Sequence, residues 1–435
     1  MTYEQALAWL DSLESLGIRP GLDRITALLA RLGDPQRDLR FVLVAGTNGK
    51  GSVVAFLSQI LREAGLRPGV YTSPHLVRFE ERIAIDGAPI PAAAVAELTT
   101  EVRDAVEGVT RDGAQTPTYF EATTALAFLH LHRSRVPIAV LEVGMGGRFD
   151  ATNVGSPLAC AITPVSLDHT QGLGRTVAEI ATQKAGIIRS GVPVVVARQE
   201  DEAMQVIAAE AAAAGAPLVA ADSCRIEPRD GFPDPPRFSL TTPDGERHAD
   251  LALALRGDHQ VGNATLAVLL AGILRRDGGL PIDERAIRHG LATAQWPGRL
   301  ELLPAAGNDE PDLLLDGAHN PDGCAMLAAY LHRHQATRPR RVLLFAAMRD
   351  KPADEMLRIL KPVVDEVVVT GLPVARGRPP ADLERQAKDA GFDATCEPDQ
   401  AAALALARRR AGARGLVVAS GSLYLVGEIQ KNLRL

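Results

Sequence analysis

A chain of 435 residues is longer than one hydrophobic core usually serves, so its length favours two domains. A formal net charge of −6 argues against nucleic acid or an anionic membrane as the main partner, and no apolar run approaches the roughly 18 residues of a membrane span. Four scattered cysteines with no C-x-x-C pair and an acidic, amphipathic N-terminus indicate no zinc knuckle, disulfide framework or export signal, and predict a cytoplasmic protein.

The first part of the chain alternates short β-branched runs with helix-length segments. The largely apolar runs are typical of strands buried on both faces of a parallel sheet, and they lie at residues 41–46, 138–144, 158–165 and 192–197. Helical patterns lie at residues 53–64, 121–135, 176–189 and, rich in alanine, 203–214. This alternation predicts an α/β domain with a mainly parallel, doubly wound sheet.

The alternation breaks at residues 224–250, which are rich in proline and aspartate and predict an irregular loop and hairpin. A helical pattern resumes at about Val261. We place the domain boundary near Trp296, because a second strand and helix series follows it. Its strands are expected at 312–318, 340–348, 366–371 and 415–421. The expected domains are residues 1–295 and a smaller α/β domain at residues 296–435.

A glycine-rich loop follows the first predicted strand in the sequence FVLVAGTNGKGSVV. It departs from the pattern G-x-x-x-x-G-K-[ST], because Val44 replaces the first glycine and Gly51 the hydroxyl residue. Backbone amides and a helix N-terminus would still face an anion there, with Lys50 adding a positive charge. The alternative is a strand-to-helix turn with a solvated lysine, which would not require three glycines and a lysine in this order.

The loop AGTNGKGS resembles that of the Mur ligase superfamily, ATP-dependent enzymes that join an amino acid to a carboxylate, and in particular its folate branch. Further blocks resemble that branch in its order along nearly the whole chain: LGDPQ, YTSPHLVRFEERI, TYFEATTALAF, LEVGMGGRFDATN, SLDHTQGLG, QKAGII, GDHQVGNA, WPGRLE and LLLDGAHNPDG. The resemblance implies a P-loop-type ATP-binding domain and a smaller Rossmann-like domain. It also implies that ATP phosphorylates a folate carboxylate and that L-glutamate attacks the acyl phosphate.

The resemblance assigns residues to the nucleotide and the metal. Phosphoryl transfer brings anions together, so Mg²⁺ and fixed cations are needed. The implied phosphate contacts are Asn48, Gly49, Lys50, Gly51 and Ser52, with Lys50 on the transferred group. The implied magnesium ligands are Ser73, Glu142 and His169, and Lys184 is expected to be carbamylated beside a second ion. The remaining implied ATP contacts are Asn263 for adenine, Arg299 for phosphates, and Asp316 and His319 together for the ribose and phosphates.

Each of these residue types also has an ordinary structural role. Glu142 could be solvated at a strand end, although ligands bind at that edge of an open α/β sheet and a carboxylate suits Mg²⁺. His169 could be a hydrogen-bonding loop residue, since imidazole is an unusual magnesium ligand. Ser73 could be a turn residue, and Lys184 a lysine on a helix surface. Asn263 could cap a helix, and the residues Asp316 and His319 could form an Asx-type turn.

Two stretches match the dihydropteroate-binding segments of bifunctional bacterial members of the family. They contain Thr118, Tyr119, Phe120 and Glu121, and Phe149, Asp150 and Ala151. Phe120 is the natural ring to stack on a pterin, and a core position is the alternative. The chain departs from the family at its N-terminus, where Arg19 replaces a frequent aspartate.

The sequence therefore predicts a bifunctional ligase that adds L-glutamate to dihydropteroate and to reduced folates. It is expected to act as a monomer on small molecules, with Mg²⁺ and ATP and without nucleic acid or membrane. One alternative is a folylpolyglutamate synthase alone. A ligase for a cell-wall or polymer substrate would lack the SPHLVRFEERI and TYFE blocks, and a non-catalytic nucleotide sensor would not need Lys184 with Glu142 and His169.

Overall fold

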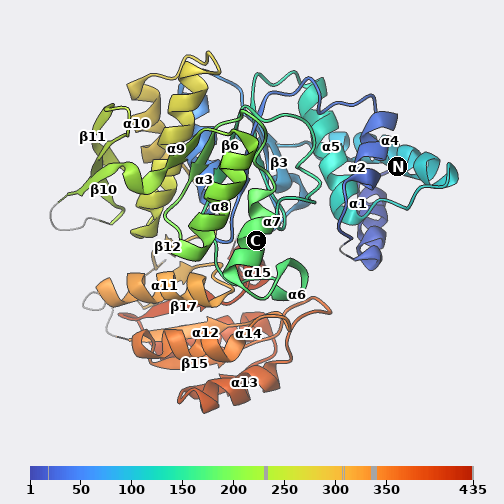
Figure 1. Ribbon diagram of the computed structural model, residues 1–435. Helices are drawn as coiled ribbons and strands as arrows, with labels where there is room; N and C mark the ends of the chain where they lie inside the picture. Colours follow the sequence, from blue (N-terminus) through green and yellow to red (C-terminus); the bar gives the residue numbers. More distant parts are fainter. Residues whose placement is uncertain (18, 230–233, 306, 308, 335–339, 434–435) are drawn as a thin grey trace. The chain divides into compact units, whose positions relative to one another are not determined.

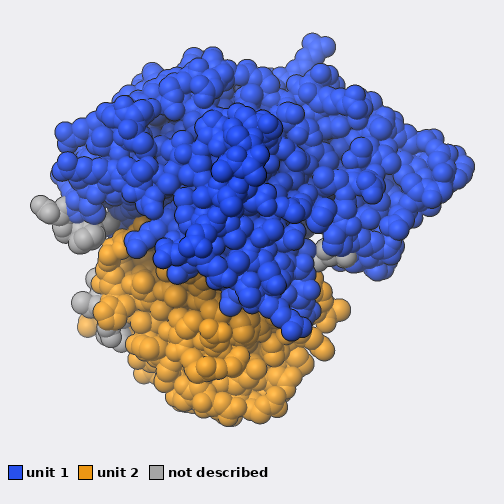
Figure 2. All heavy atoms as spheres, in the orientation of Figure 1, with its two compact units in different colours: residues 1–254, 260–295 blue, residues 255–259, 296–435 orange. Residues whose placement is uncertain are grey.

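The computed structural model describes residues 1–17, 19–229, 234–305, 307, 309–334 and 340–433 (Figure 1). By residue contacts the chain forms two compact units, coloured separately in Figure 2. Unit 1 contains residues 1–254 and 260–295, and unit 2 contains residues 255–259 and 296–435. Within the described part of the chain, no helix combines the length and the apolar character needed to cross a bilayer.

Unit 1 is built on an eight-stranded sheet in the order β4-β3-β2-β5-β1-β6-β7-β8. Six neighbouring strands from β2 to β8 run parallel, and β3 and β4 add an antiparallel edge. The strands are β1 (Phe41–Ala45), β2 (Gly69–Tyr71), β3 (Ile83–Ile85), β4 (Ala88–Pro89), β5 (Ala139–Glu142), β6 (Ala159–Ile162), β7 (Val194–Val196) and β8 (Leu218–Ala220). The expected α/β fold with a mainly parallel sheet is confirmed.

The central strands are buried along their whole length, as their continuous apolar sequences predict. Every residue of β1, β5, β6 and β7 is buried. The four strands expected from the sequence of this unit are therefore present. The sequence missed β2, β3, β4 and β8, which are only two or three residues long and carry too little pattern to detect.

The helices of unit 1 pack on this sheet or on one another (Figure 1). They are α1 (Tyr3–Ser12), α2 (Asp23–Arg31), α3 (Lys50–Glu63), α4 (Ala92–Arg111), α5 (Tyr119–Arg133), α6 (Thr170–Leu173), α7 (Val177–Ala185), α8 (Asp201–Ala214), α9 (His259–Arg276) and α10 (Glu284–Thr293). Short 3-10 turns lie at Leu13–Leu16, Phe79–Arg82 and Ala221–Ser223. Helices α3 and α10 approach closely, because a Cβ atom on Gly290 would lie 2.5 Å from the Cα of Ile60.

The expectation of an irregular loop and hairpin at residues 224–250 is correct for the hairpin, which residues 237–252 form, but the rest of the segment is more regular than expected. The segment forms a separate antiparallel sheet of three strands, β9 (Arg225–Pro228), β10 (Arg237–Thr241) and β11 (Arg247–Ala252). Strand β10 buries Phe238 and Leu240 on alternate positions, the period-two pattern of a strand with one covered face. The proline and aspartate residues of the connections obscured this pattern, and residues 230–233 lie outside the described part.

Unit 2 contains a six-stranded sheet in the order β12-β13-β17-β14-β15-β16, parallel except at β12. The strands are β12 (Glu301–Leu303), β13 (Asp312–Leu315), β14 (Arg341–Phe345), β15 (Glu366–Val369), β16 (Asp393–Cys396) and β17 (Leu416–Ser420). The helices are α11 (Pro321–Arg333), α12 (Ala353–Leu360), α13 (Pro380–Asp389), α14 (Gln400–Ala411) and α15 (Leu423–Leu433), with a 3-10 turn at Lys361–Val363. All four strands expected for this part are present.

Candidate active site

The glycine-rich loop joins β1 to α3 and requires glycine at two positions. Gly46 has φ 144° and Gly49 has φ 92°, values that side chains other than hydrogen adopt poorly. Space is also lacking, because a Cβ on Gly46 would lie 1.7 Å from Thr163 Oγ1 and one on Gly49 would lie 2.4 Å from Asn263 Oδ1. The loop is therefore in close contact with the residue after β6 and with α9.

Hydrogen bonds fix this loop to the segment that follows β6. The Thr47 amide donates to the Pro164 carbonyl at 2.9 Å, and its hydroxyl donates to the Ser166 carbonyl at 3.1 Å. Gly49 is the N-cap of α3 and has no side chain to occupy the amides of the first turn. The end of α3 is therefore suited to an anion such as a phosphate group.

Two lysine amines converge on one backbone oxygen of the loop. Lys50 Nζ lies 3.2 Å and Lys184 Nζ lies 2.7 Å from the carbonyl oxygen of Gly46. Lys184 comes from α7 and is only 4% exposed. Burial, and then the charge of Lys50, lower the pKa of Lys184 to about 7, while Asp168 and Asp150 act in the opposite direction. Lys184 is thus a buried amine that readily loses its proton.

Glu142 ends β5 at the carboxyl edge of the sheet, where its strand pairs with β1. Its side chain is almost buried, and Oε1 lies 4.0 Å from Lys50 Nζ while Oε2 accepts the Ser73 amide at 3.3 Å. The structure thus brings Glu142, Ser73 and Lys50 together beside the loop. One carboxylate near a phosphate-binding loop is a donor set that suits Mg²⁺, which keeps several waters and binds substrate phosphates.

His169 has an unusual backbone, with φ 50° in the left-handed region, and it precedes the short helix α6. Its side chain is 40% exposed, and its Nε2 lies 3.9 Å from Asp168 Oδ2. The sequence reasoning missed Asp168, although its charge acts on Lys184. Its place directly before His169 in SLDHT was the signal available.

A chain of buried amide groups runs from α9 to the start of α3. Gln260 Nε2 donates to Ser52 Oγ at 3.2 Å, and Gln260 Oε1 accepts from Asn263 Nδ2 at 3.0 Å. All three residues are buried. Ser52 and Asn263 were expected at the nucleotide, whereas Gln260 was missed because a glutamine in GDHQ carries no distinctive pattern.

Two of the expected pterin residues are held in structural interactions at the start of α5. Thr118 and Glu121 form a capping box, and Glu121 Oε2 also pairs with Arg24 Nε at 3.1 Å. Arg24 in turn donates to the backbone carbonyl of Arg19, whose neighbour Ile18 lies outside the described residues. This network ties the N-terminal segment to α5.

The two aromatic residues at the start of α5, Tyr119 and Phe120, contact side chains near the ends of β2 and β5. Phe120 stacks on Tyr71 with ring centroids 6.2 Å apart, and a Cβ on Gly144 would lie 2.5 Å from the Phe120 ring. Tyr119 lies under the guanidinium of Arg82 at 5.4 Å, and burial is the main cause that raises the pKa of Tyr119 to about 12. Phe120 is therefore only partly covered and close to the end of β5.

The second pterin stretch combines one buried carboxyl with one exposed ring. Asp150 accepts from the Met145 amide at 2.9 Å and from the Thr152 amide at 3.0 Å, and burial raises the pKa of Asp150. Ala151 is buried, whereas Phe149 is 50% exposed. Phe149 is therefore the residue of this stretch whose side chain is available to a ligand without disturbing the core.

In unit 2 three expected residues surround Gly317, just after β13. Asp316 accepts the amides of Leu300 and Ala318 at 2.9 Å each. A Cβ on Gly317 would lie 2.5 Å from Arg299 Nη1, and His319 Nδ1 lies 2.8 Å from the Gly317 carbonyl oxygen. His259 belongs to the same unit and was missed by sequence reasoning. Burial is the main cause that lowers the pKa of His259; the charge of Asp316 acts in the opposite direction, and the charge of Arg299 lowers the pKa further.

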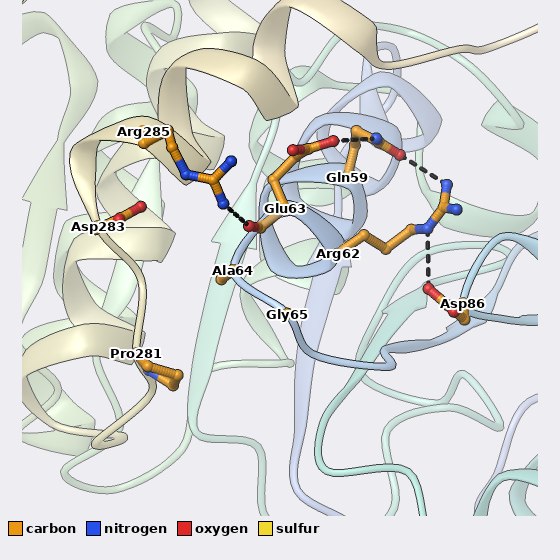
Figure 3. A pocket seen from close by; sticks show the side chains of 9 residues that line it. All are labelled: Gln59, Arg62, Glu63, Ala64, Gly65, Asp86, Pro281, Asp283 and Arg285. Carbon is orange, nitrogen blue, oxygen red and sulfur yellow. Dashed lines mark hydrogen bonds and ion pairs between the residues drawn. The ribbon is translucent and has the colours of Figure 1, made fainter.

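A polar pocket of about 350 Å³ lies at the far end of α3 (Figure 3). The fourteen residues of α3 put it about 20 Å from Lys50. Two of its guanidinium groups are already engaged, since Arg62 Nε donates to the Asp86 carboxylate at 3.1 Å and Arg285 Nη2 donates to the backbone carbonyl of Glu63 at 3.1 Å. This pocket is separate from the loop and its lysines.

Within the described part of the chain, the potential metal ligands Glu246, His248 and Glu284 form a cluster whose ligand atoms lie within 4.8 Å of one another. Both carboxylates are bound by guanidinium groups, Glu246 by Arg275 and Glu284 by Arg288. Because these positive charges would repel a cation, we interpret the group as an ion-pair network that joins β11 to α9 and α10.

Comparison with known proteins gives full-length matches. Residues 44–271 match the family model of the Mur ligase middle domain, and residues 298–423 match that of the Mur ligase glutamate ligase domain. The chain is 37% identical over 434 residues to dihydrofolate synthase/folylpolyglutamate synthase of Bacillus subtilis, with 99% of each chain covered.

Two solved structures are similar over almost their whole length. One is folylpolyglutamate synthase of Mycobacterium tuberculosis complexed with ADP and AMPPCP, with TM-score 0.88, 34% identity, and 99% of this chain and 98% of that chain covered. The other is FolC of Escherichia coli in complex with DHPP and ADP, with TM-score 0.85, 32% identity, and 99% and 97% covered.

Proposed function

This chain belongs to the Mur ligase family, and from that membership we propose that it is a bifunctional dihydrofolate synthase and folylpolyglutamate synthase. It uses ATP to join L-glutamate to dihydropteroate and to reduced folates. The observation that carries the proposal is the grouping of Lys50, Lys184 and Glu142 around the glycine-rich loop, on a chain similar over its full length to enzymes of that name.

In this mechanism the loop and Lys50 act on the phosphates of ATP. The amides at the start of α3 hold phosphate oxygens, and Lys50 turns from the carbonyls of Gly46 and Thr47 toward the transferred phosphoryl group. Glu142 and Ser73 would hold Mg²⁺, with His169 as a further ligand. When bound, Mg²⁺ neutralises charge on the phosphates. The substrate carboxylate takes the phosphoryl group, and the amine of glutamate then displaces phosphate from the acyl phosphate.

Lys184 carries a carbamate in the active enzyme. A carbamate forms from a neutral amine, and burial already lowers the pKa of Lys184 to about 7. The carbamate nitrogen keeps one hydrogen, so the bond to the Gly46 carbonyl at 2.7 Å can persist after modification. The new negative charge would lie near Lys50 and supply the anion that a second metal ion needs.

The other nucleotide contacts follow from side-chain chemistry. Asn263 can donate to and accept from adenine, and Asp316 can accept from ribose hydroxyls. Arg299 and His319 supply donors for phosphate oxygens. Asn48 to Ser52 and Asn263 belong to unit 1, and the other three residues belong to unit 2.

The pterin of the substrate lies along the two aromatic stretches. Phe120 and Phe149 supply ring surface, while Thr118, Glu121 and Asp150 hold the backbone that presents these rings. The enzyme acts as a monomer in the cytoplasm. These substrates are small molecules, which agrees with the absence of a net positive charge.

The proposal is tested by measuring ADP release from the purified full chain with Mg²⁺, ATP and L-glutamate. Dihydropteroate and a tetrahydrofolate are supplied in separate reactions, and each should stimulate ADP release with stoichiometric formation of the glutamate conjugate. The matched control is Glu142→Gln, which keeps the shape of the side chain but removes its charge and should lose both reactions. If neither dihydropteroate nor the tetrahydrofolate stimulates ADP release, the proposal is refuted.

A second candidate is a folylpolyglutamate synthase without the first activity. It is favoured by the departure at Arg19, whose segment is tied by Arg24 to the start of α5. Turnover with tetrahydrofolate but not with dihydropteroate would select this alternative.

A further inference from the structure

Gln260 occupies a buried position between two groups expected at the nucleotide. It lies in the first turn of α9, is 1% exposed, and bonds Ser52 of α3 on one side and Asn263 of its own helix on the other. Gln260 thus links two residues that are expected at the nucleotide. Each end of its amide has to match the donor or acceptor that these residues present to it.

The amide of Gln260 has a donor end and an acceptor end, and each faces a different partner. Because Oε1 accepts from Asn263 Nδ2 at 3.0 Å, the Asn263 amide presents Oδ1 on its other side, toward Gly49. If Gln260 turned over, its NH₂ group would face the NH₂ group of Asn263. Asn263 would then have to turn as well. The two amide orientations are therefore coupled.

The same amide determines what the Ser52 hydroxyl can do. Ser52 Oγ accepts from Gln260 Nε2 at 3.2 Å, so its own hydrogen points elsewhere and can donate to a phosphate oxygen. The interaction with Ser52 also favours one orientation of the Gln260 amide. In this orientation the Gln260 NH₂ group donates to Ser52 Oγ, and the Ser52 hydroxyl hydrogen stays available to a phosphate oxygen. Ser52 thus acts on Asn263 through Gln260.

The orientation of an asparagine amide distinguishes the two purines. Adenine offers an amino donor at N6 and an acceptor at N7, which match one Oδ1 and one Nδ2 hydrogen, whereas guanine offers acceptors at both O6 and N7. Resting on the proposed function, in which Asn263 contacts the base, we propose that Gln260 is a positioning residue that fixes the Asn263 amide and so makes the site prefer adenine to guanine.

The test measures equilibrium dissociation constants of ADP and GDP, with Mg²⁺, for the full chain and its variants. The readout is the ratio of the GDP constant to the ADP constant, because a general loss of stability or of phosphate contacts changes both constants alike. Gln260→Met, which keeps the volume but removes both polar ends, should lower this ratio at least about tenfold. Ser52→Ala should lower it about threefold, although Ser52 itself faces phosphate.

Two further variants complete the design. Gln260→Glu still accepts from Asn263 Nδ2 and should keep the ratio, while the Ser52 hydroxyl turns to the carboxylate and both nucleotides bind more weakly. Thr265→Val is the matched control on the same helix, since the Thr265 hydroxyl bonds only the Val261 carbonyl in the described contacts, and it should change neither constant.

The outcomes separate this inference from the proposed function. If Asn263→Ala loses the ratio while Gln260→Met keeps it, the positioning role is wrong and the base contact stands. If both variants keep it, Asn263 does not read the base and both assignments fail. A ratio near one in the unmodified protein would also overturn the inference. Should Gln260→Met not fold, an unchanged ratio in Ser52→Ala or a lost ratio in Gln260→Glu overturns it.

Discussion

The buried amine of Lys184 donates a hydrogen bond of 2.7 Å to the carbonyl oxygen of Gly46, the first glycine of the glycine-rich loop. The two residues are 138 positions apart in the sequence. This bond joins α7 to the loop and leaves the amine beside Lys50. The low pKa of Lys184 has another cause, which is that its charged amine would lie where little water reaches it and where a second positive charge, that of Lys50, is close.

The first prediction concerns stability and pH. The folded chain holds the pKa of Lys184 at about 7, below its ordinary value of 10.5. Between these two values the unfolded chain binds one more proton than the folded chain, so the free energy of unfolding rises with pH through this window. The penalty is fully present below about pH 7 and disappears above about pH 10.5.

Lys184→Met should therefore raise the free energy of unfolding at pH 7 by on the order of a few kcal/mol and flatten its dependence on pH. Urea unfolding from pH 6.5 to 9.5, in buffer without carbon dioxide or Mg²⁺, measures this. The same variant should lose ligase activity. The low pKa of Lys184 would be contradicted if the free energy of unfolding of the unsubstituted protein depended on pH no more steeply than that of Lys184→Met.

The second prediction is that Lys184 accepts carbon dioxide. Protein equilibrated with ¹³C-labelled bicarbonate should show a carbamate signal in its ¹³C spectrum, and Lys184→Ala should lack it. Activity should fall when dissolved carbon dioxide is removed and return when bicarbonate is added. Full activity in carbon dioxide-free buffer, with a plain ammonium in an electron-density map, would exclude the modification.

The third prediction concerns Lys50 as the cation on the transferred phosphoryl group. Lys50→Ala should lower kcat at least about a hundredfold, corresponding to roughly 2.7 kcal/mol of transition-state stabilisation. Its thermal stability should change little, since the Lys50 amine bonds only loop carbonyls and faces Glu142 at 4.0 Å. Lys388→Ala is the control, because Lys388 is an exposed residue of α13 in unit 2 that pairs with Glu384. Near-normal turnover of a folded Lys50→Ala protein would remove the phosphate-loop assignment.

The fourth prediction tests the close approach of the loop to α9. Gly49→Ala should weaken nucleotide binding strongly, because its Cβ would lie 2.4 Å from Asn263 Oδ1 at a positive φ of 92°. Gly65→Ala is the matched control at the other end of α3. It has a similar φ of 77° but no atom within 4 Å of the added Cβ. Equal effects of the two substitutions on the ADP dissociation constant would mean that backbone strain, and not the contact with Asn263, is responsible.

The fifth prediction separates the two folate reactions. Phe149→Ala should raise the KM for dihydropteroate more than that for a tetrahydrofolate, while stability is retained because the ring is half exposed. Asp150→Ala would be a poor test of the same stretch, since it would leave the amides of Met145 and Thr152 without their acceptor. An equal rise of both KM values would mean that the second aromatic stretch does not form a distinct pterin contact.

Much of the fold could be predicted from the sequence. The strands at β1, β5, β6 and β7 are continuous apolar segments whose burial on both faces requires a parallel sheet covered by helices. The loop between β1 and α3 was also recognisable, because glycines that free backbone amides, together with a lysine, are typical of a loop that binds an anion. These features depend on residues that are neighbours in the chain, so local pattern is enough to find them.

The antiparallel sheet at β9 to β11 could not be predicted in the same way, because proline and aspartate in its connections masked the short alternation of Phe238 and Leu240. Nor could sequence reasoning find Gln260, whose role depends on Ser52, 208 positions earlier. The sequence determined which chemical groups are available and the strands that carry them to one edge of the sheet. Only the tertiary structure decided that Lys184 is buried against Gly46, because burial and hydrogen-bond partners depend on contacts between segments that lie far apart along the chain.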